Sequence, residues 1–255
     1  MSSSNKISLY GFNNLTKNLC FSLYRVHYLT TPAVINRYNS FINNWYSSDN
    51  LNVLLNKVCH AIGGNVLNIA KQDYLPQGAS VTLMISEEAK PESLVAHLDK
   101  SHLCIHTYPE EMPQNGVAVF RTDIELSTCG VISPLKVIDY VIEAFSADVV
   151  DIDYRIRGMT RDGLGKKHFN DQKINKLSEH LSQGTIEKYK VRDSSLPQSN
   201  LFHCKLAKKH VDLDQQVFEY QEQSISAEDK IKIKSQLMNE IKTIYSYDAG
   251  KWGLN

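Results

Sequence analysis

The sequence lacks several features that mark whole classes of protein. Its 28 lysines and arginines balance 28 aspartates and glutamates, which gives no electrostatic argument for nucleic acid or an anionic membrane as a partner. No apolar run approaches the roughly 18 residues that a membrane span needs. Met1 to Lys6 lack the apolar core of a signal peptide. We therefore expect a soluble, cytoplasmic protein that binds neither nucleic acid nor membrane.

Cysteine is scarce, and its spacing shows no pairing. The chain has five cysteines, an odd number with no CxxC pair, at Cys20, Cys59, Cys104, Cys129 and Cys204. This pattern argues against a disulfide scaffold and favours free thiols in a reducing compartment.

The apolar content of 42% over 255 residues is enough to bury a sizeable core. Alternating apolar residues predict strands at 7–29, 65–73, 79–86, 94–107, 117–126 and 149–157. Helical spacing predicts three helices: one that begins at Thr31-Pro32, one that spans 51–62 and one that begins at Ser133-Pro134. Because strands outnumber helices and most turns are short, we expect an α/β (α+β) sandwich, with a largely antiparallel sheet and helices packed on one face.

After Gly158 the sequence becomes more polar and is interrupted by glycines. We expect one main domain over about 7–160 and a C-terminal extension over about 161–255 that packs on it. Within the extension, 201–206 has the pattern of a strand, and Ser226 with Asp229 has the spacing of a capping box before a last helix. Between two of the predicted strands, Leu75-Pro76-Gln77-Gly78 has the composition of a type II turn.

Groups that transfer protons are concentrated in one strand-like segment, residues 98–110 (LDKSHLCIHTYPE), and Cys129 follows soon after. A single serine, histidine or cysteine in a strand is usually structural, and a free cysteine often behaves as a small hydrophobic residue. The presence of nucleophile, base and acid within about thirty residues makes a functional site the better interpretation of the group.

Three chemistries fit this segment to different degrees. A zinc site would use His97, His102, Cys104, His106 and Cys129, but HxCxH is not a common ligand spacing. A cysteine–histidine nucleophile would use Cys129, but no third, orienting group is evident.

The third chemistry starts from Ser101. A serine hydroxyl can attack the preceding carbonyl, here that of Lys100, and convert the amide to an ester, which leaves by β-elimination. The dehydroalanine that remains hydrolyses to a pyruvoyl group, an electron sink that can replace pyridoxal phosphate. No motif for a bound organic cofactor is present, and this favours a cofactor made from the chain itself.

Three segments carry a family resemblance: residues 74–80 (YLPQGAS), 100–110 (KSHLCIHTYPE) and 125–130 (ELSTCG), with 11–17 (GFNNLTK) in support. In these segments the chain resembles the bacterial S-adenosylmethionine decarboxylase proenzymes, specifically their longer branch. The shorter members have Glu at the position of Lys100 and Asp at that of Glu125, and both departures match the longer branch.

The resemblance implies an activity and a role for each matching residue. The chain would cleave itself between Lys100 and Ser101, giving a β chain (1–100) and an α chain (101–255) headed by a pyruvoyl group from Ser101. That group would decarboxylate S-adenosylmethionine through a Schiff base to give the aminopropyl donor for spermidine. The remaining roles are the processing base (His106), a serine that assists processing (Ser80), the catalytic proton donor (Cys129), the ribose-binding carboxylate (Glu110) and adenine-stacking rings (Tyr74 and Phe12). The branch is associated with activation by Mg²⁺, for which the sequence assigns no ligand.

The spacing of Ser101 and His106 carries a separate geometric argument. In an extended strand, residues five apart are separated by roughly 17 Å and point to opposite faces. A base must lie within about 3 Å of the proton it removes. Either the strand bends sharply, or His106 comes from a second protomer, as in a two-fold dimer. The resemblance implies the same shared site, with Ser101 and Cys129 from one protomer and Ser80, His106, Tyr74 and Glu110 from the other, in dimers that can pair into tetramers of αβ units.

Two other functions remain open from the residues alone. One is a nucleoside-binding module that has kept the pocket without the chemistry, against which the intact Ser101, His106 and Cys129 argue. The other is a pyruvoyl-dependent decarboxylase of an amino acid such as arginine or aspartate, against which Tyr74 and Glu110 argue.

Overall fold

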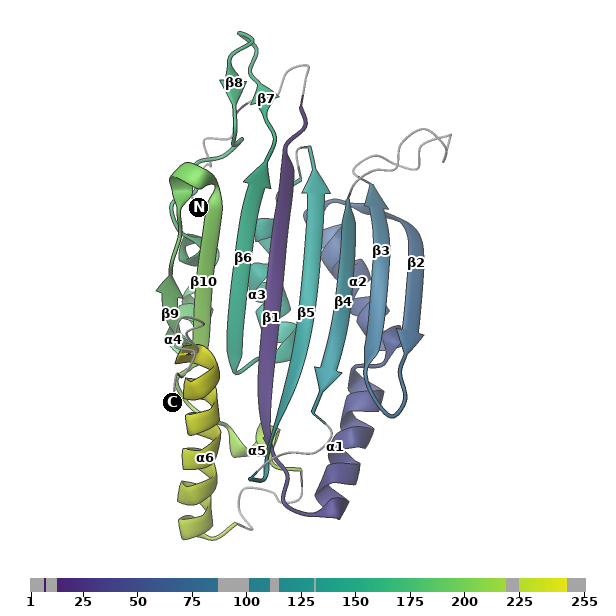
Figure 1. The fold of residues 1–255 in the computed structure, drawn as a ribbon, viewed down its shortest axis with the longest axis vertical. Coiled ribbons are helices and arrows are strands. Elements are labelled where there is room, and N and C mark those ends of the chain that lie inside the picture. The colour runs from purple at the N-terminus through teal and green to yellow at the C-terminus, as the bar shows by residue number, and fades with distance from the viewer. Residues whose placement is uncertain are drawn as a thin grey trace, which may run out of the picture.

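The computed structural model describes residues 7, 13–86, 101–110, 115–130, 132–218 and 225–246. Eight strands form one sheet in the spatial order β2-β3-β4-β5-β1-β6-β10-β9 (Figure 1), and neighbouring strands are antiparallel. The strands are β1 (Thr16–Tyr28), β2 (Asn65–Asp73), β3 (Ala79–Ser86), β4 (His102–Pro109), β5 (Val117–Cys129), β6 (Val149–Arg157), β9 (Tyr189–Asp193) and β10 (Leu201–Lys208). A small ribbon of β7 (Thr160–Arg161) and β8 (Lys167–His168) follows β6.

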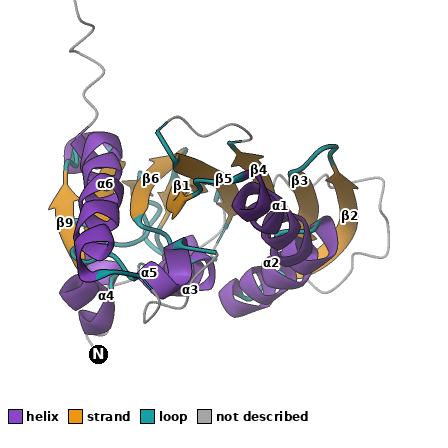
Figure 2. Ribbon diagram, turned by 90° about the horizontal axis from the view of Figure 1, so that it is seen from below, coloured by secondary structure: helices purple, strands orange, loops and turns teal. Residues whose placement is uncertain are grey.

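One face of the sheet is covered by helices and holds the main core (Figure 2). The helices of the described residues are α1 (Pro32–Trp45), α2 (Ser48–Ile62), α3 (Ile138–Phe145), α4 (Gln183–Lys188), α5 (Leu213–Gln216) and α6 (Ala227–Ser246), with 3₁₀ turns at 134–137, 177–180 and 197–199. Strand alternation decides which residues face these helices. In β1, for example, Leu19, Phe21 and Leu23 are at most 2% exposed, whereas the residues between them are half-buried. The predicted antiparallel sheet with helices on one face is confirmed.

The other face, which we call the open face, carries the even-numbered residues of β1, β3 and β4 and the odd-numbered residues of β5 and β6. Among the described residues, α6 covers one corner of it and lies over the lower end of β10 in Figure 1. This contact forms a second core cluster, which includes Val26, Val149, Ala207, Leu237 and Ile241. The C-terminal extension therefore supplies two strands to the main sheet and a helix to its second face.

The helix ends follow the local chemistry of the sequence. Thr31 caps α1, as expected, with its hydroxyl oxygen accepting the amide of Val34 at 3.3 Å. Ser47 caps α2, which begins at Ser48, three residues before the predicted start at Leu51, and Gly63 ends it at φ 91°. The Ser226–Asp229 cap of α6 is confirmed, since Ser226 Oγ accepts the Asp229 amide at 3.1 Å and donates to the Asp229 carboxylate at 2.6 Å.

Two local expectations are wrong in detail. The Ser133-Pro134 start leads into a 3₁₀ turn, and α3 proper begins only at Ile138. The connection between β2 and β3 is not a type II turn, which needs a positive φ at Gln77. The positive φ, 107°, lies instead at Gly78, whose carbonyl accepts the Tyr74 amide at 2.8 Å.

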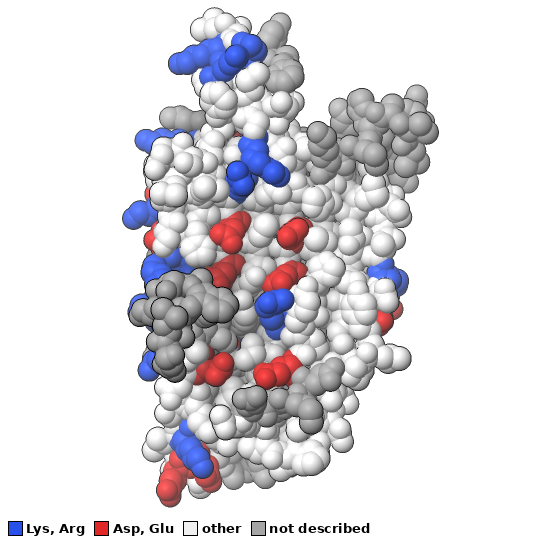
Figure 3. All heavy atoms as spheres, viewed as in Figure 1, with Lys and Arg blue, Asp and Glu red and all other residues white. Residues whose placement is uncertain are grey.

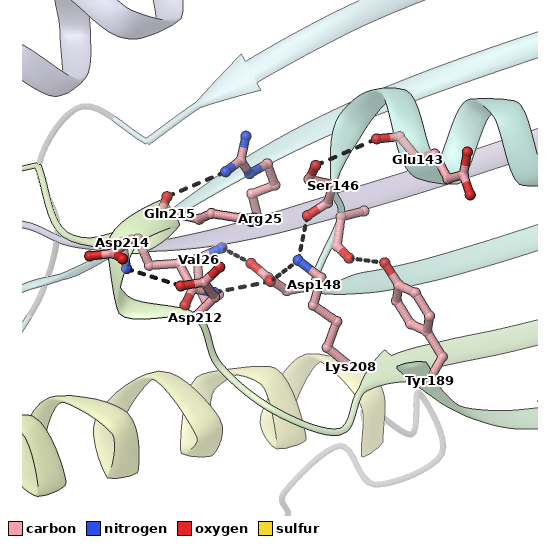
Figure 4. A network of polar contacts seen from close by, with 12 residues as sticks. Arg25, Val26, Glu143, Ser146, Asp148, Tyr189, Lys208, Asp212, Asp214 and Gln215 are labelled. Carbon is pink, nitrogen blue, oxygen red and sulfur yellow. Dashed lines mark hydrogen bonds and ion pairs between the residues drawn. The ribbon is translucent and has the colours of Figure 1, made fainter. Parts of the chain in front are cut away.

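A buried polar network joins the extension to the lower part of β1 (Figure 4). The Asp148 carboxylate, 1% exposed, accepts hydrogen bonds from the Val26 amide at 2.9 Å and from Lys208 Nζ and Gln216 Nε2, each at 3.0 Å. Because every partner is a donor, the buried charge is well compensated.

Close to this network, His27 is fully buried among aromatic rings. Its ring centroid lies 5.3 Å from that of Tyr38 and 5.1 Å from that of Phe218. Burial, with smaller contributions from the positive charges of Arg25 and Lys208, holds the pKa of His27 well below its ordinary value. The folded state therefore keeps this imidazole neutral.

This burial predicts an acid-dependent loss of stability. Below about pH 6.5 the unfolded chain takes up a proton on His27 that the folded chain cannot, which costs up to ~1.4 kcal/mol of unfolding free energy per pH unit. The stability is present above that pH and falls as the pH falls. In His27→Phe, whose ring suits the same aromatic surroundings, urea unfolding from pH 7 to pH 5 should show a shallower decline. An equal slope in the two proteins would contradict the assignment.

Candidate functional site

Ser101 and Cys129 meet at the upper end of the sheet in Figure 1, where β4 begins and β5 ends. Ser101 is 2% exposed, and its Oγ accepts a hydrogen bond from the Cys129 amide at 3.2 Å. Its carbonyl accepts the Ile85 amide at 3.2 Å, which continues the ladder with β3. The serine oxygen is thus held in a buried position beside the half-buried Cys129.

A second group of predicted site residues lies further along the sheet. His106 of β4 is exposed on the open face, in register with Ser80 of β3 and Asp123 of β5. The Ser80 hydroxyl lies 2.9 Å from the hydroxyl of Tyr74, a side chain that is 43% exposed. Ser80, His106 and Tyr74 therefore form one cluster at the β2–β3–β4 edge of the open face.

Glu110 follows β4 directly, and its carboxylate is already engaged with the backbone. Its Oε2 accepts the Val119 amide at 2.8 Å, and its own amide donates to the Val119 carbonyl at 3.1 Å. These two bonds fix the half-buried side chain at the end of β4. Lys100 and Phe12 lie outside the described residues.

The two clusters do not meet within one chain. Residues 102–109 of β4 pair without interruption with β3 or β5, so the strand does not bend sharply between Ser101 and His106. At strand rise the two residues are roughly 17 Å apart. Ser101 falls on the same side of the strand as the buried Leu103 and Ile105, whereas His106 points to the open face. Of the two geometries that the sequence left open, the bent strand is excluded.

The middle of the open face carries acidic side chains, with basic side chains nearer its upper end (Figure 3). Asp123 and Glu125 come from β5, Asp151 and Asp153 from β6, and the basic Arg155 and Arg157 continue along β6. The surface is polar although it belongs to a central part of the sheet.

Four cysteines have thiols that stay protonated at neutral pH. Burial, followed by the charge of Glu125, raises the pKa of Cys20 to about 11 and also raises that of Cys104. Burial raises the pKa of Cys59 to about 11 and that of Cys204 to about 12. Since a thiolate is the reactive form, these four positions are poorly suited to nucleophilic chemistry.

A zinc or magnesium site is not assembled by the described part of the chain. His102, Cys104 and His106 alternate on one strand, but no three histidine, cysteine, aspartate or glutamate side chains among the described residues converge well enough to bind a metal ion. Within the same residues, no helix has the length and apolarity needed to cross a membrane.

Comparison with known proteins identifies the family. The family model for S-adenosylmethionine decarboxylase matches residues 34–158. The S-adenosylmethionine decarboxylase proenzyme of Xylella fastidiosa (strain M12) is 46% identical over 251 residues, covering 94% of this chain and 95% of the relative. The proenzyme of Stenotrophomonas maltophilia (strain K279a) is 45% identical over the same shares. The chain belongs to the S-adenosylmethionine decarboxylase family. This is a family of enzymes.

Among solved structures, the adenosylmethionine decarboxylase of Aquifex aeolicus VF5 matches this family member at 18% identity and a TM-score of 0.35, over 57% of this chain and 91% of that one.

Two residues near the site in this S-adenosylmethionine decarboxylase family member had no role assigned from the sequence. Lys17 is 1% exposed and contacts the backbone just beyond Cys129. The sequence pattern could have pointed to Lys17, because this charged residue occupies an inward position of β1 in the same alternation as Leu19 and Phe21. Thr107 of β4 is buried, and its Oγ1 accepts the Ala79 amide at 2.7 Å beside Ser80. A threonine in a strand gives no comparable signal.

The Thr107 contact predicts a measurable loss of stability. Thr107→Val keeps the shape of the side chain but leaves the buried Ala79 amide without this acceptor, which should cost about 1–3 kcal/mol. Thr82→Val, on the open face of neighbouring β3, is the matched control and should cost less. Urea unfolding of both variants tests this, and an equal or smaller loss for Thr107→Val would refute it.

Proposed function

We propose that the chain is a proenzyme that cleaves itself between Lys100 and Ser101 and then decarboxylates S-adenosylmethionine. The observation that supports the proposal is the hydrogen bond that the Cys129 backbone amide donates to Ser101 Oγ, because it holds the oxygen of the predicted nucleophile in a buried position beside the backbone of the predicted proton donor. Family membership supports the same reaction.

The cleavage uses atoms of the chain alone, apart from one water. Ser101 Oγ attacks the carbonyl carbon of Lys100, and the C–N bond breaks as the acyl group moves to oxygen and the serine nitrogen gains a proton. A base then removes the Cα proton of Ser101, and the ester C–O bond breaks, which releases Lys100 as a carboxylate at the end of the shorter chain. Water replaces the nitrogen of the resulting dehydroalanine, ammonia leaves, and a pyruvoyl group remains at residue 101.

The surroundings of Ser101 suit such a group. The position is buried at a strand start, and the Cys129 amide already donates to an oxygen there. The pyruvoyl group supplies an electron sink for the bond to the departing carboxylate. Cys129 supplies the proton at its Sγ, delivered to the substrate carbon that loses carbon dioxide, and the product is an aminopropyl donor for spermidine synthesis.

The substrate would be held by residues of the second cluster. S-adenosylmethionine carries a sulfonium charge and an adenine ring, both of which suit aromatic faces such as Tyr74, with Phe12 as the second predicted ring. Tyr74 is exposed enough to stack on a ligand, and its contact with Ser80 orients it. Glu110 is the predicted ribose ligand, held in place by Val119. The described residues offer no Mg²⁺ site, and no step is assigned to that ion.

A second copy of the chain would complete the site. His106 is on the open face and roughly 17 Å from Ser101 of its own straight strand. Two open faces that meet around a two-fold axis bring the β2–β3–β4 cluster of each protomer toward the Ser101 end of the other. We infer a dimer in which Ser101 and Cys129 work with His106, Ser80, Tyr74 and Glu110 from the partner, and such dimers can pair into tetramers.

Intact-mass spectrometry of the denatured protein tests the cleavage. The native sequence should give two chains, residues 1–100 and 101–255, the larger with a pyruvoyl mass and no free amine. Ser101→Ala lacks the nucleophile and should remain a single chain of 255 residues without decarboxylase activity. Cys129→Ala keeps the Cys129 backbone amide, so it should still be cleaved but turn over substrate at least ~100-fold more slowly. Cleavage of Ser101→Ala, or normal turnover by Cys129→Ala, would overturn the respective role.

Co-expression tests the shared site. His106→Ala alone should stay uncleaved. When it is co-expressed with Ser101→Ala, whose His106 is intact, mixed dimers should contain cleaved His106→Ala chains, identified by a mass tag. The matched control is co-expression with the double variant Ser101→Ala/His106→Ala, which should restore nothing. If the tagged chain stays uncleaved in proven mixed dimers, the base is not supplied in trans.

A further inference from the structure

Lys17 is a charged side chain buried at the end of the sheet where Ser101 and Cys129 meet. It is 1% exposed, and its Nζ donates to the Asp171 carboxylate at 2.6 Å, to the Gly130 carbonyl at 3.0 Å and to the Ile132 carbonyl at 3.1 Å. An ammonium group has three donors, and each of them has a partner here. Two of the partners belong to the turn that directly follows Cys129.

The same turn is tied to the start of β1 through the backbone. Thr16 pairs with Cys129 in the antiparallel ladder, and the Gly130 amide donates to the Leu15 carbonyl at 3.3 Å. Gly130 has a φ of 68°, where a residue without a side chain is favoured. The amide and the carbonyl of Gly130 are therefore both held, the amide by Leu15 and the carbonyl by Lys17.

Asp171 brings the C-terminal extension into this contact. It follows β8, is 2% exposed, and its carbonyl accepts the Ile7 amide at 2.9 Å. Burying an ion pair is costly, and apolar residues of similar size often stabilise a protein at least as well. The pair is therefore better explained by the geometry that it imposes on the Cys129 turn than by its contribution to stability.

Building on the proposed function, we propose that Lys17 and Asp171 are positioning residues that hold the Cys129–Gly130 turn so that the thiol faces the reacting carbon. The extension thereby completes the catalytic centre, although it supplies no catalytic residue itself. A displacement of about 1 Å at a reacting group can cost 10²-fold in rate, so a small relaxation of this turn would be visible in turnover.

The first test is Lys17→Met, which removes the charge and keeps a long side chain. The cleaved fraction is isolated, and kcat and KM are measured per cleaved chain together with the midpoint of urea unfolding. We expect kcat to fall about 10- to 100-fold with KM within about twofold, because the turn is displaced while the substrate-binding cluster is untouched. A folded variant that stays uncleaved would support the proposal too, since the Cys129 amide also holds Ser101 Oγ.

A matched control separates positioning from stability. Lys208 pairs with the buried Asp148 at 3.0 Å in the network of Figure 4, which lies away from the Ser101 end of the sheet. Lys208→Met should lower the unfolding midpoint as Lys17→Met does, yet leave kcat per cleaved chain unchanged. Equal kcat losses in both variants would overturn the proposal, because a general loss of stability would then explain them.

The double variant Lys17→Met/Asp171→Leu gives the sharper readout. Removing both charges should recover part of the unfolding midpoint lost in Lys17→Met, because no uncompensated buried carboxylate remains. It should not recover kcat, because the Gly130 and Ile132 carbonyls still lack their donor. Recovery of both quantities together would show that the pair is only structural.

One measurement does not depend on decarboxylation. In the uncleaved Ser101→Ala background, Lys17→Met should accelerate alkylation of Cys129 by iodoacetamide, measured by peptide mass mapping, whereas Lys208→Met should not. Unchanged alkylation would contradict the positioning role. If the native chain neither cleaves itself nor decarboxylates S-adenosylmethionine, the proposed function fails, and this alkylation result still reports on the turn.

Discussion

The straightness of β4 is the constraint on which the rest of the site depends. Its pairing with β3 and β5 runs without a bulge, so residues along it are separated by the rise of an extended strand and alternate between two faces. Ser101 is thereby held at one end, against Cys129, while His106 is displayed further along on the open face. The predicted site residues of one chain therefore lie in two separate places on the sheet.

The open face is the surface that carries His106 and Ser80. It is polar, it has carboxylates over β5 and β6, and in the described part of the chain α6 covers one corner of it. The four cysteines Cys20, Cys59, Cys104 and Cys204 have raised thiol pKa values, so they add no reactive thiolates to the protein. The predicted chemistry is thus limited to a few positions on or beside β3, β4 and β5.

Most of the strands and helix caps could be predicted from the sequence, because the signals for them are local. Alternation in β1, β5 and β6 and the caps at Thr31 and Ser226 depend on neighbouring residues. The odd spacing of Ser101 and His106 likewise assigns them to opposite faces of a strand from the sequence alone. The family resemblance, by contrast, supplied the expected roles of Tyr74, Ser80, Glu110, His106 and Cys129.

The features that the sequence did not predict depend on partners that are distant along the chain. Lys17 occupies an inward position of β1, which was a usable signal, but Asp171 lies in a polar, glycine-interrupted segment with no periodicity. The aromatic surroundings of His27 come from α1 and from Phe218, far apart in sequence. No rule of sequence spacing predicts these contacts, because the residues become neighbours only when the chain has folded.

The strand order has a consequence for the proposed cleavage after Lys100. The shorter fragment would contain β1, β2 and β3, and the longer one would contain β4, β5, β6, β9 and β10. In the sheet, β1 of the shorter fragment lies between β5 and β6 of the longer one, so strands of the two fragments alternate. Pulling them apart would mean breaking the ladders on both sides of β1 and the β3–β4 ladder as well. Such a cut would therefore sever the backbone while leaving the strands of both pieces paired in one sheet.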